Sequence, residues 1–419
     1  MTSYPQYDPM QLYRAKRDSL RRGVAVKYTI LGFISSGTYG RVYKAESKDE
    51  PKRLHAIKKF KLDKEGDAAT YTGLSQSAIR EIALNREIHH ENVAALKEVI
   101  LEDKSIYMVF EYAEHDFLQL IYHYSQTVQL PISQSVLKSA TYQLLNGLFY
   151  LHEAHIIHRD LKPANILVTS SGVVKIGDLG LARLTYEPLQ PLSAGDKVVV
   201  TIWYRAPELL LGAKHYTKSI DIWAVGCVLA ELVNLRPIFK GEEAKPDAKK
   251  NAPFQKDQLL KIFETLGTPT ELDWPDLKFM PEYHNMQQMN RYPPHLYQWC
   301  NNRHRKPVFP QQGYELLSQL FQYDPARRLT AKEALRHRWF QEDPMPSANI
   351  FHGIPVSHIP PQRRITNDAP SMMPMAAATQ SLVTMNQLPH SSQVRTAAAR
   401  GDAIHYGGGG QSRKKARLG

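Results

Sequence analysis

The segment IIHRDLKPANILV, residues 156–168, has two apolar, strand-like runs that flank a loop. This loop carries three polar side chains whose types and spacing suit one chemical task. Asp160 could accept a proton from an attacking hydroxyl, Lys162 could neutralise a phosphate in transfer, and Asn165 could hold a divalent cation. Thirteen residues after Asn165, Asp178 of KIGDLG offers a second hard oxygen ligand, suited to Mg²⁺. The alternative is a pair of turns with capping acids. The spacing, followed by Asp-x-Gly and then by APELLL, favours phosphoryl transfer.

Two segments nearer the N-terminus could complete such a site. In SSGTYGRV, Gly37 and Gly40 could let a hairpin backbone approach phosphates, although a glycine in a hairpin commonly only forms the turn. Ser35 stands where the G-x-G-x-x-G pattern has its first glycine. Lys58 of HAIKKF could pair with Glu81 of LSQSAIREIALNREI and so direct its ammonium toward nucleotide phosphates. Without that partner, a lysine at a strand end usually faces solvent.

The elements that must position these residues change character along the chain. From Tyr28 to about Tyr112, apolar and polar residues alternate as in strands, interrupted by one helical pattern over residues 75–88. After Ala113 the apolar spacing becomes helical, for example over residues 133–154 and 218–233. Residues 9–23 predict a short basic helix that ends at Gly23. This order predicts an α+β protein.

The bulk composition restricts the class of protein. The net charge of +12 lies mostly in the ends, because residues 1–30 contribute +4 and residues 360–419 contribute +6. This distribution argues against a nucleic-acid-binding core. Two distant cysteines exclude a disulfide framework, and neither a membrane span nor a signal peptide is expected. Residues 343–419 have few large apolar side chains, so we expect a disordered basic tail.

Taken together, these motifs resemble the protein kinase family from about Tyr28 to Phe340. They occur in the family's order: SSGTYGRV, AIK, the Glu of SAIRE, HRDLKPAN, DLG, APE, DIWAVG and a late Arg in DPARRLTAKEAL. The resemblance implies the two-lobed kinase fold. Its small N-lobe, residues 28–112, is mainly β with one key helix, and its larger C-lobe, residues 113–342, is mainly α. ATP is expected in the cleft between them, and the HRDLKPAN form is similar to serine/threonine kinases.

The resemblance also implies roles for individual residues. Asp160 is the expected catalytic base and Lys162 a contact to phosphate and substrate, with Asn165 and Asp178 as Mg²⁺ ligands. Glu208 is expected to pair with Arg328 and brace the C-lobe. The expected ATP-binding residues, hinge included, are Ile34, Gly37, Gly40, Val42, Ala56, Lys58, Glu81, Phe110, Glu111, Ala113, Asp116 and Leu167.

Finer motifs are similar to the proline-directed branch, and within it to the Mediator-associated kinases that pair with cyclin C. They include SAIREIALNREI, FEYAEHDF and FQEDPMPSANIF. This implies a nuclear enzyme with a C-type cyclin and other Mediator kinase-module subunits as partners, residues 1–27 helping to contact the cyclin. The implied substrates carry Ser/Thr-Pro sites, as in the RNA polymerase II C-terminal domain and transcription factors. The Met- and Gln-bearing tail suggests a fungal form. A transcription-elongation or other proline-directed kinase, and a pseudokinase scaffold, stay open.

The activation segment implied by the resemblance, residues 178–208, contains an unusual acid. Asp196 of LSAGDKVVVTIWYRAPE falls where many relatives carry a Thr or Ser that must be phosphorylated. Arg80, Arg159 and Arg183 could converge on it, and Arg205 is expected to shape the pocket for the substrate's proline. A carboxylate carries less charge than a phosphate, so we expect a partial mimic of a phosphate. The alternative is an ordinary loop acid. Leu179, in place of the usual Phe, is expected to hold Asp178 less rigidly.

Overall fold

The computed structural model describes residues 10–14, 22–36, 40–60, 76–102, 105–185, 201–244, 253–301 and 309–366. Among these residues no helix is both long and apolar enough to cross a membrane. The predicted helix over residues 9–23 is described at residues 10–14, which are helical. Gly23 has an extended backbone and precedes a second short helix, α2 (Val24–Lys27).

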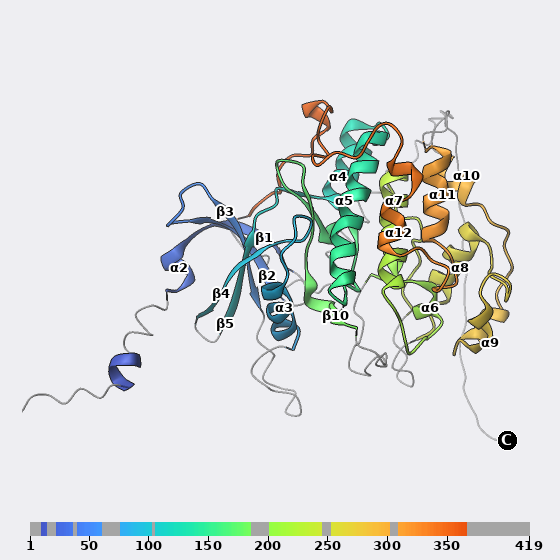
Figure 1. Ribbon diagram of the computed structural model, residues 1–419, viewed down its shortest axis with the longest axis horizontal. Helices are drawn as coiled ribbons and strands as arrows, with labels where there is room; N and C mark the ends of the chain where they lie inside the picture. The colour runs from blue at the N-terminus through green and yellow to red at the C-terminus, as the bar shows by residue number, and fades with distance from the viewer. Residues whose placement is uncertain are drawn as a thin grey trace, which may run out of the picture. The chain divides into compact units, whose positions relative to one another are not determined.

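The N-lobe is an antiparallel sheet of five strands in the order β1-β2-β3-β5-β4, with helix α3 (Gln76–Glu87) beside it (Figure 1). The strands are β1 (Tyr28–Ser36), β2 (Gly40–Ser47), β3 (Leu54–Phe60), β4 (Leu96–Glu102) and β5 (Ser105–Glu111). On β3, His55 and Ile57 are buried while Ala56 and Lys58 are half-buried, because alternate residues of a strand point to opposite faces. This alternation places Lys58 and its cross-strand neighbours Val42 and Met108 on one face of the sheet.

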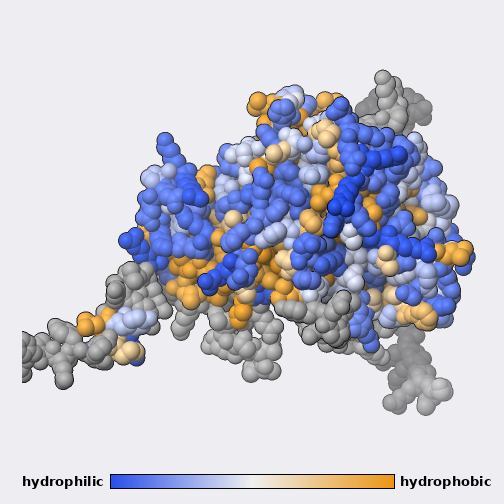
Figure 2. Space-filling model, viewed as in Figure 1, coloured by the Kyte–Doolittle hydropathy of each residue, from blue (hydrophilic) through white to orange (hydrophobic). Residues whose placement is uncertain are grey.

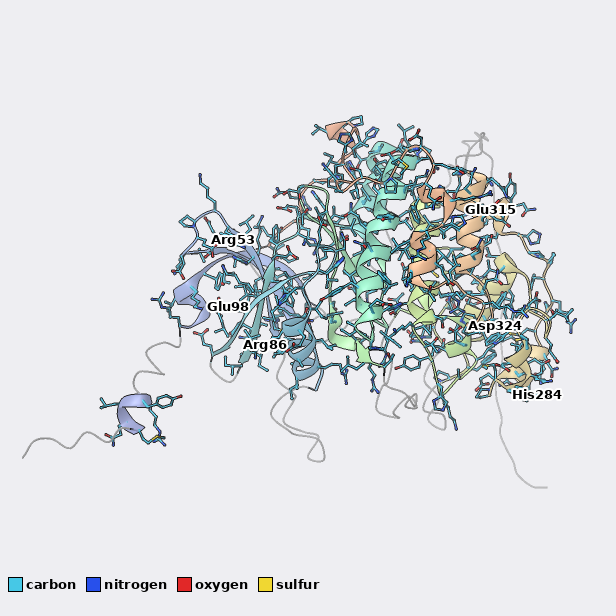
Figure 3. All side chains as sticks on the ribbon, viewed as in Figure 1. Arg53, Arg86, Glu98, His284, Glu315 and Asp324 are labelled. Atoms are coloured by element: carbon cyan, nitrogen blue, oxygen red, sulfur yellow. The ribbon has the colours of Figure 1, made fainter. Side chains whose placement is uncertain are left out.

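Part of the predicted N-terminal extension packs against this sheet. Val24 is buried with Tyr28, and its backbone N–H donates to Glu102 of β4 over 2.9 Å. Glu98 of β4, labelled in Figure 3, accepts from the Lys27 ammonium at 2.5 Å and from the Tyr28 hydroxyl at 2.6 Å. These contacts attach α2 to the N-lobe, so the lobe begins a few residues before Tyr28.

The C-lobe is mainly helical and is built around two long helices, α5 (Gln134–Glu153) and α7 (Ser219–Asn234). Every residue of α7 is buried, as expected for a helix that is apolar on all sides. The shorter helices around them are α4 (Phe117–His123), α6 (Pro207–Leu210), α8 (Lys256–Leu266), α9 (Tyr283–Gln287), α10 (Leu296–Asn301), α11 (Gln311–Leu320) and α12 (Ala331–Leu335). One large apolar core joins these helices to the strands that carry the candidate site.

Five two- or three-residue strands position the polar motifs. The strands β6 (His115–Asp116), β8 (Ile166–Val168) and β9 (Val174–Ile176) form one small sheet, and β7 (Ile156–Ile157) pairs with β10 (Arg183–Leu184). The segment HRDLKPAN therefore spans the gap from β7 to β8, and KIGDLG leaves the end of β9. The sequence predicted the two flanking apolar runs, and burial of Ile157, Ile166 and Ile176 holds their ends in the core.

The expectation of disorder from residue 343 is wrong for residues 343–366, which we call the C-terminal strap. Ile350 and Phe351 are buried in the C-lobe core. The Ser347 amide donates to Ser139 Oγ at 2.9 Å, and the Ile350 amide donates to the Gly172 carbonyl at 3.0 Å. The sequence of the strap has no helical or strand periodicity. Single side-chain contacts and backbone hydrogen bonds hold the strap in place instead. Residues 367–419 lie outside the described residues.

Candidate active site

Asp160 lies in the loop between β7 and β8, and its two carboxylate oxygens have different surroundings. Its Oδ2 accepts from Lys162 Nζ at 2.8 Å and from Asn165 Nδ2 at 2.9 Å. Its Oδ1 is buried and has no hydrogen-bond partner among the described residues. Such an atom is costly to leave unpaired, so its lone pairs are suited to accept from a further group. One oxygen is thus fixed in place while the other is ready to accept a hydroxyl proton.

The backbone of this loop is held by Asp221, the first residue of DIWAVG, to which the sequence assigned no individual role. The Asp221 carboxylate accepts from the amides of His158 and Arg159, both at 2.8 Å, and also contacts His152 at 3.1 Å. Arg159 adopts a left-handed backbone with φ 71°, which costs energy in a non-glycine residue. Asp221 therefore secures a strained turn just before Asp160. An acid in the first turn of a mainly apolar helical pattern was the signal that could have revealed its role.

The structure brings Lys58, Glu81 and Asp178 together. Lys58 Nζ lies 2.7 and 2.8 Å from the Glu81 oxygens and 2.9 Å from Asp178 Oδ1. Burial by itself would lower the pKa of Lys58, but the two carboxylates outweigh burial and raise its pKa above the ordinary value. Burial likewise opposes ionisation of Asp178, but Lys58 holds the pKa of that carboxyl below its usual range. Lys58 and Asp178 are therefore both charged and held in contact with one another.

Asp178 and Asn165 are chemically suited to hold a divalent cation. Asp178 has a left-handed backbone with φ 60°, just after β9, and the next residue, Leu179, is 1% exposed in the core. Asn165 donates its amide nitrogen twice, to the Asp160 carbonyl at 2.8 Å and to its carboxylate, which leaves the amide oxygen as the donor for a metal. An ionised carboxylate with an amide oxygen is the hard oxygen donor set that Mg²⁺ prefers. The residues present therefore fit this ion.

Most of the expected nucleotide-binding residues that the structure describes lie on strands of the N-lobe sheet or on β8. Ile34, Val42, Ala56 and Leu167 are each half-buried, whereas neighbouring apolar residues of the same strands are buried. Val42 pairs with Lys58 of β3, and Ala56 pairs with Phe110 of β5, so Val42, Ala56 and Phe110 lie on the same face of the sheet as Lys58. Gly40 opens β2, and Ala113 and Asp116 follow β5. Gly37 lies outside the described residues.

The start of the hinge is fixed by polar contacts of Glu111. Its side chain accepts from the Ala95 amide at 2.7 Å and pairs with Lys175 at 2.8 Å. The backbone N–H of Glu111 donates to the Ala95 carbonyl at 3.0 Å. These contacts join β5 to β9, and therefore join the hinge to the strand that leads to Asp178.

The structure describes some of the expected activation-segment residues but not Asp196. Asp196 lies outside the described residues, so the meeting of three arginines on it stays a prediction. Arg80 is on α3, Arg183 is on β10, and the Arg159 guanidinium lies 5.4 Å from the centre of the Tyr216 ring. Arg205 follows a short 3₁₀ turn, and burial lowers its pKa.

Glu208 and Arg328 form a buried, two-pronged ion pair. The two guanidinium nitrogens donate to the two carboxylate oxygens at 2.8 and 3.0 Å, and the side chains are 4% and 0% exposed. Arg328 also donates to the carbonyls of Ser219, Gln322 and Tyr323, and stacks on Trp223 at 5.1 Å. The pair therefore joins the end of the activation segment to the helices of the C-lobe.

Comparison with known proteins identifies the arrangement. Residues 28–340 match the protein kinase domain family. The chain is 55% identical over 360 residues to the serine/threonine-protein kinase SSN3 of Yarrowia lipolytica, covering 86% of this chain and 88% of that protein. It is 56% identical over 359 residues to the protein of the same name in Aspergillus oryzae, covering 82% and 86%. The chain therefore belongs to the protein kinase family and is a serine/threonine protein kinase.

Proposed function

We propose that this kinase is cyclin-dependent, works in the Mediator kinase module in the nucleus, and transfers the γ-phosphate of ATP to Ser/Thr-Pro sites. Expected substrates are the RNA polymerase II C-terminal domain and transcription factors. The observation that supports the reaction best is Asp160, whose Oδ1 is buried without a partner while its Oδ2 is fixed. The motifs similar to Mediator-associated kinases support the finer assignment.

In the proposed reaction each residue has one task. The substrate hydroxyl donates its proton to Asp160 as its oxygen bonds to the γ-phosphorus, and the bond from that phosphorus to the oxygen it shares with the β-phosphate breaks, releasing ADP. Lys162 lies 2.8 Å from Asp160 and stabilises negative charge on the transferring group. Lys58 orients the phosphates from the opposite lobe. A bound Mg²⁺, held by Asn165 and Asp178, would supply charge neutralisation for the phosphates.

Exposed apolar side chains on the N-lobe support the proposal that a cyclin docks there. Apolar side chains are exposed on three of its elements, with Val26 58%, Ile79 51% and Leu101 70% exposed. Figure 2 shows apolar surface gathered at the lower edge of this lobe, around α3. Exposed apolar surface of this kind is typical of interaction sites. We expect Ile79→Asp to abolish co-purification with a C-type cyclin. Leu272→Asp is the control, because Leu272 is 86% exposed on the C-lobe and should not affect the complex. Equal cyclin recovery with both variants would contradict this docking surface.

The acid at position 196 supports the proposal that this kinase is active without phosphorylation of its activation segment. We expect the unphosphorylated cyclin complex to be active, with an acid from the cyclin completing the charge that one carboxylate leaves unsatisfied. Arg80→Ala and Arg159→Ala should each lower that activity. An absolute requirement for an upstream activating kinase would rule the mimic out. A transcription-elongation kinase, the second candidate, usually has Thr or Ser at this position.

The proline preference rests on Arg205 and the residues before WYR. Peptide arrays should show enrichment of Pro directly after the phosphorylated Ser or Thr, and a flat profile at that position would refute it. For location, the basic run SRKKAR, residues 412–417, suggests nuclear import, with a solvated tail as the alternative. Removal of this run from a fluorescent fusion should reduce nuclear accumulation if it acts as an import signal.

A further inference from the structure

The C-terminal strap leads from the C-lobe to the strand that covers the nucleotide cleft. Its first half is fixed, because Gln143 Nε2 donates to the Ser347 carbonyl at 2.9 Å and Ile350 is 1% exposed in the core. His123 then contacts the Ser357 carbonyl at 2.9 Å. Figure 1 shows the strap, in orange and red, passing over the end of α4 toward β1. One segment therefore connects the two lobes across the cleft.

The far end of the strap pairs with β1. The Phe33 amide donates to the Thr366 carbonyl at 2.8 Å, and the Thr366 amide donates to the Phe33 carbonyl at 3.1 Å. Gly32 makes this approach possible, because a Cβ added there would lie 3.0 Å from Ile365 Cβ and 3.2 Å from the Thr366 carbonyl oxygen. The paired residue directly precedes Ile34, an expected wall of the nucleotide site. Movement of β1 must therefore break these bonds or carry the strap with it.

Arg363 of the strap forms an ion pair with Asp116, an expected nucleotide contact. Arg363 Nη2 lies 2.8 Å from Asp116 Oδ2, and the Arg363 amide donates to the Glu114 carbonyl at 3.2 Å. The other oxygen, Asp116 Oδ1, accepts from the Gln119 amide at 2.7 Å. Both oxygens are therefore engaged, and the Asp116 side chain is 12% exposed. The Arg363 Nε is buried without a hydrogen-bond partner among the described residues, so this contact is weaker than a fully hydrogen-bonded one.

We propose that the C-terminal strap is a gate on the nucleotide cleft, which must release β1 and Asp116 before a nucleotide enters or leaves. The proposal rests on the nucleotide site proposed above. A closed gate slows entry and release together, because both pass through the same opened state. It therefore changes the exchange rates more than the affinity.

Stopped-flow kinetics of the full chain in its cyclin complex test the gate. The probe is an ADP analogue with a fluorescent base and an unmodified ribose, so that the label does not disturb contacts at Asp116. Arg363→Ala should raise both the association and the dissociation rate about fivefold, as for loss of a contact worth about 1 kcal/mol. Arg364→Ala, an exposed neighbour on the same strap, is the matched control and should leave both rates unchanged. Gly32→Val should act like Arg363→Ala, because it displaces the strap from β1 without altering any strap residue.

Thermal unfolding of each variant shows that it is folded before its rates are compared. The gate would be overturned if the association and dissociation rates of the analogue in Arg363→Ala and Gly32→Val stay within twofold of wild type while the analogue still binds. The proposed nucleotide site would be unaffected by that result. A fall in affinity with no rise in the rates would also overturn it. Failure of the wild-type complex to bind the analogue at all would overturn the nucleotide site and the gate with it.

Discussion

The buried pair of Glu208 and Arg328 allows a quantitative prediction about stability. Removing one partner of a fully buried, two-pronged pair leaves an uncompensated charge in the interior, which costs about 3–5 kcal/mol. Arg328 keeps three carbonyl acceptors in Glu208→Ala, but these cannot balance its charge. We therefore expect Glu208→Ala to lower the free energy of unfolding by about 3–5 kcal/mol, and Glu208→Gln, which retains an acceptor, to lower it by less.

Urea unfolding followed by circular dichroism and by tryptophan fluorescence measures the effect. The control is Glu264→Ala, because the Lys261–Glu264 pair is 37% and 38% exposed and should leave the midpoint unchanged. The double variant Glu208→Leu/Arg328→Met buries no lone charge, so its loss should be smaller than the sum of the two single losses. Additive losses, or a Glu208→Ala midpoint equal to that of wild type, would refute the reasoning.

Three further predictions concern the site. Burial raises the pKa of Asp160 although Lys162 opposes this effect, and a catalytic base must be ionised, so kcat/KM should fall as the pH falls through that raised pKa. Lys162→Met removes the opposing charge, so it should move the acidic limb of the pH profile to higher pH. A shift of that limb to lower pH would contradict the assignment of Asp160 as the base. Lys58→Met should lower kcat about 10²–10³-fold, because it removes the positive charge that orients the phosphates. A steady-state kinase assay measures the effect, and a kcat within twofold of wild type would contradict that role. Leu179→Ala should destabilise the fold by about 2–4 kcal/mol in thermal unfolding, and a neutral effect would mean that Leu179 is not closely packed in the core.

Much of the fold and of the chemistry could be predicted from local patterns. The alternation along β3 indicated a strand with Lys58 on one face, and the apolar spacing indicated α5 and α7 close to their observed limits. The polar motif in residues 156–168 was predicted as a loop between two apolar strands, which is how the structure has it. These features depend on short-range periodicity, so sequence carries them directly.

Features that depend on single long-range contacts could not be predicted in this way. The strap has no period, and it is ordered by contacts such as those of Ser347 with Ser139 and of Arg363 with Asp116, more than 200 residues apart. Composition therefore wrongly suggested disorder for this segment. The role of Asp221 was similarly missed, because its hydrogen bonds to a distant strained turn leave no local trace except an acid in a mainly apolar helix.

Phosphate transfer by the purified cyclin complex, wild type against Asp160→Asn, tests the central claim most directly. The acceptor is a Ser-Pro peptide, and binding of ADP to each protein is measured in parallel. Because Asp160 Oδ1 is the proposed proton acceptor, Asp160→Asn should lower kcat about 10²–10⁴-fold while ADP binding changes little. Wild-type complex that binds ADP but transfers no phosphate, or an Asp160→Asn variant as active as wild type, would contradict this mechanism.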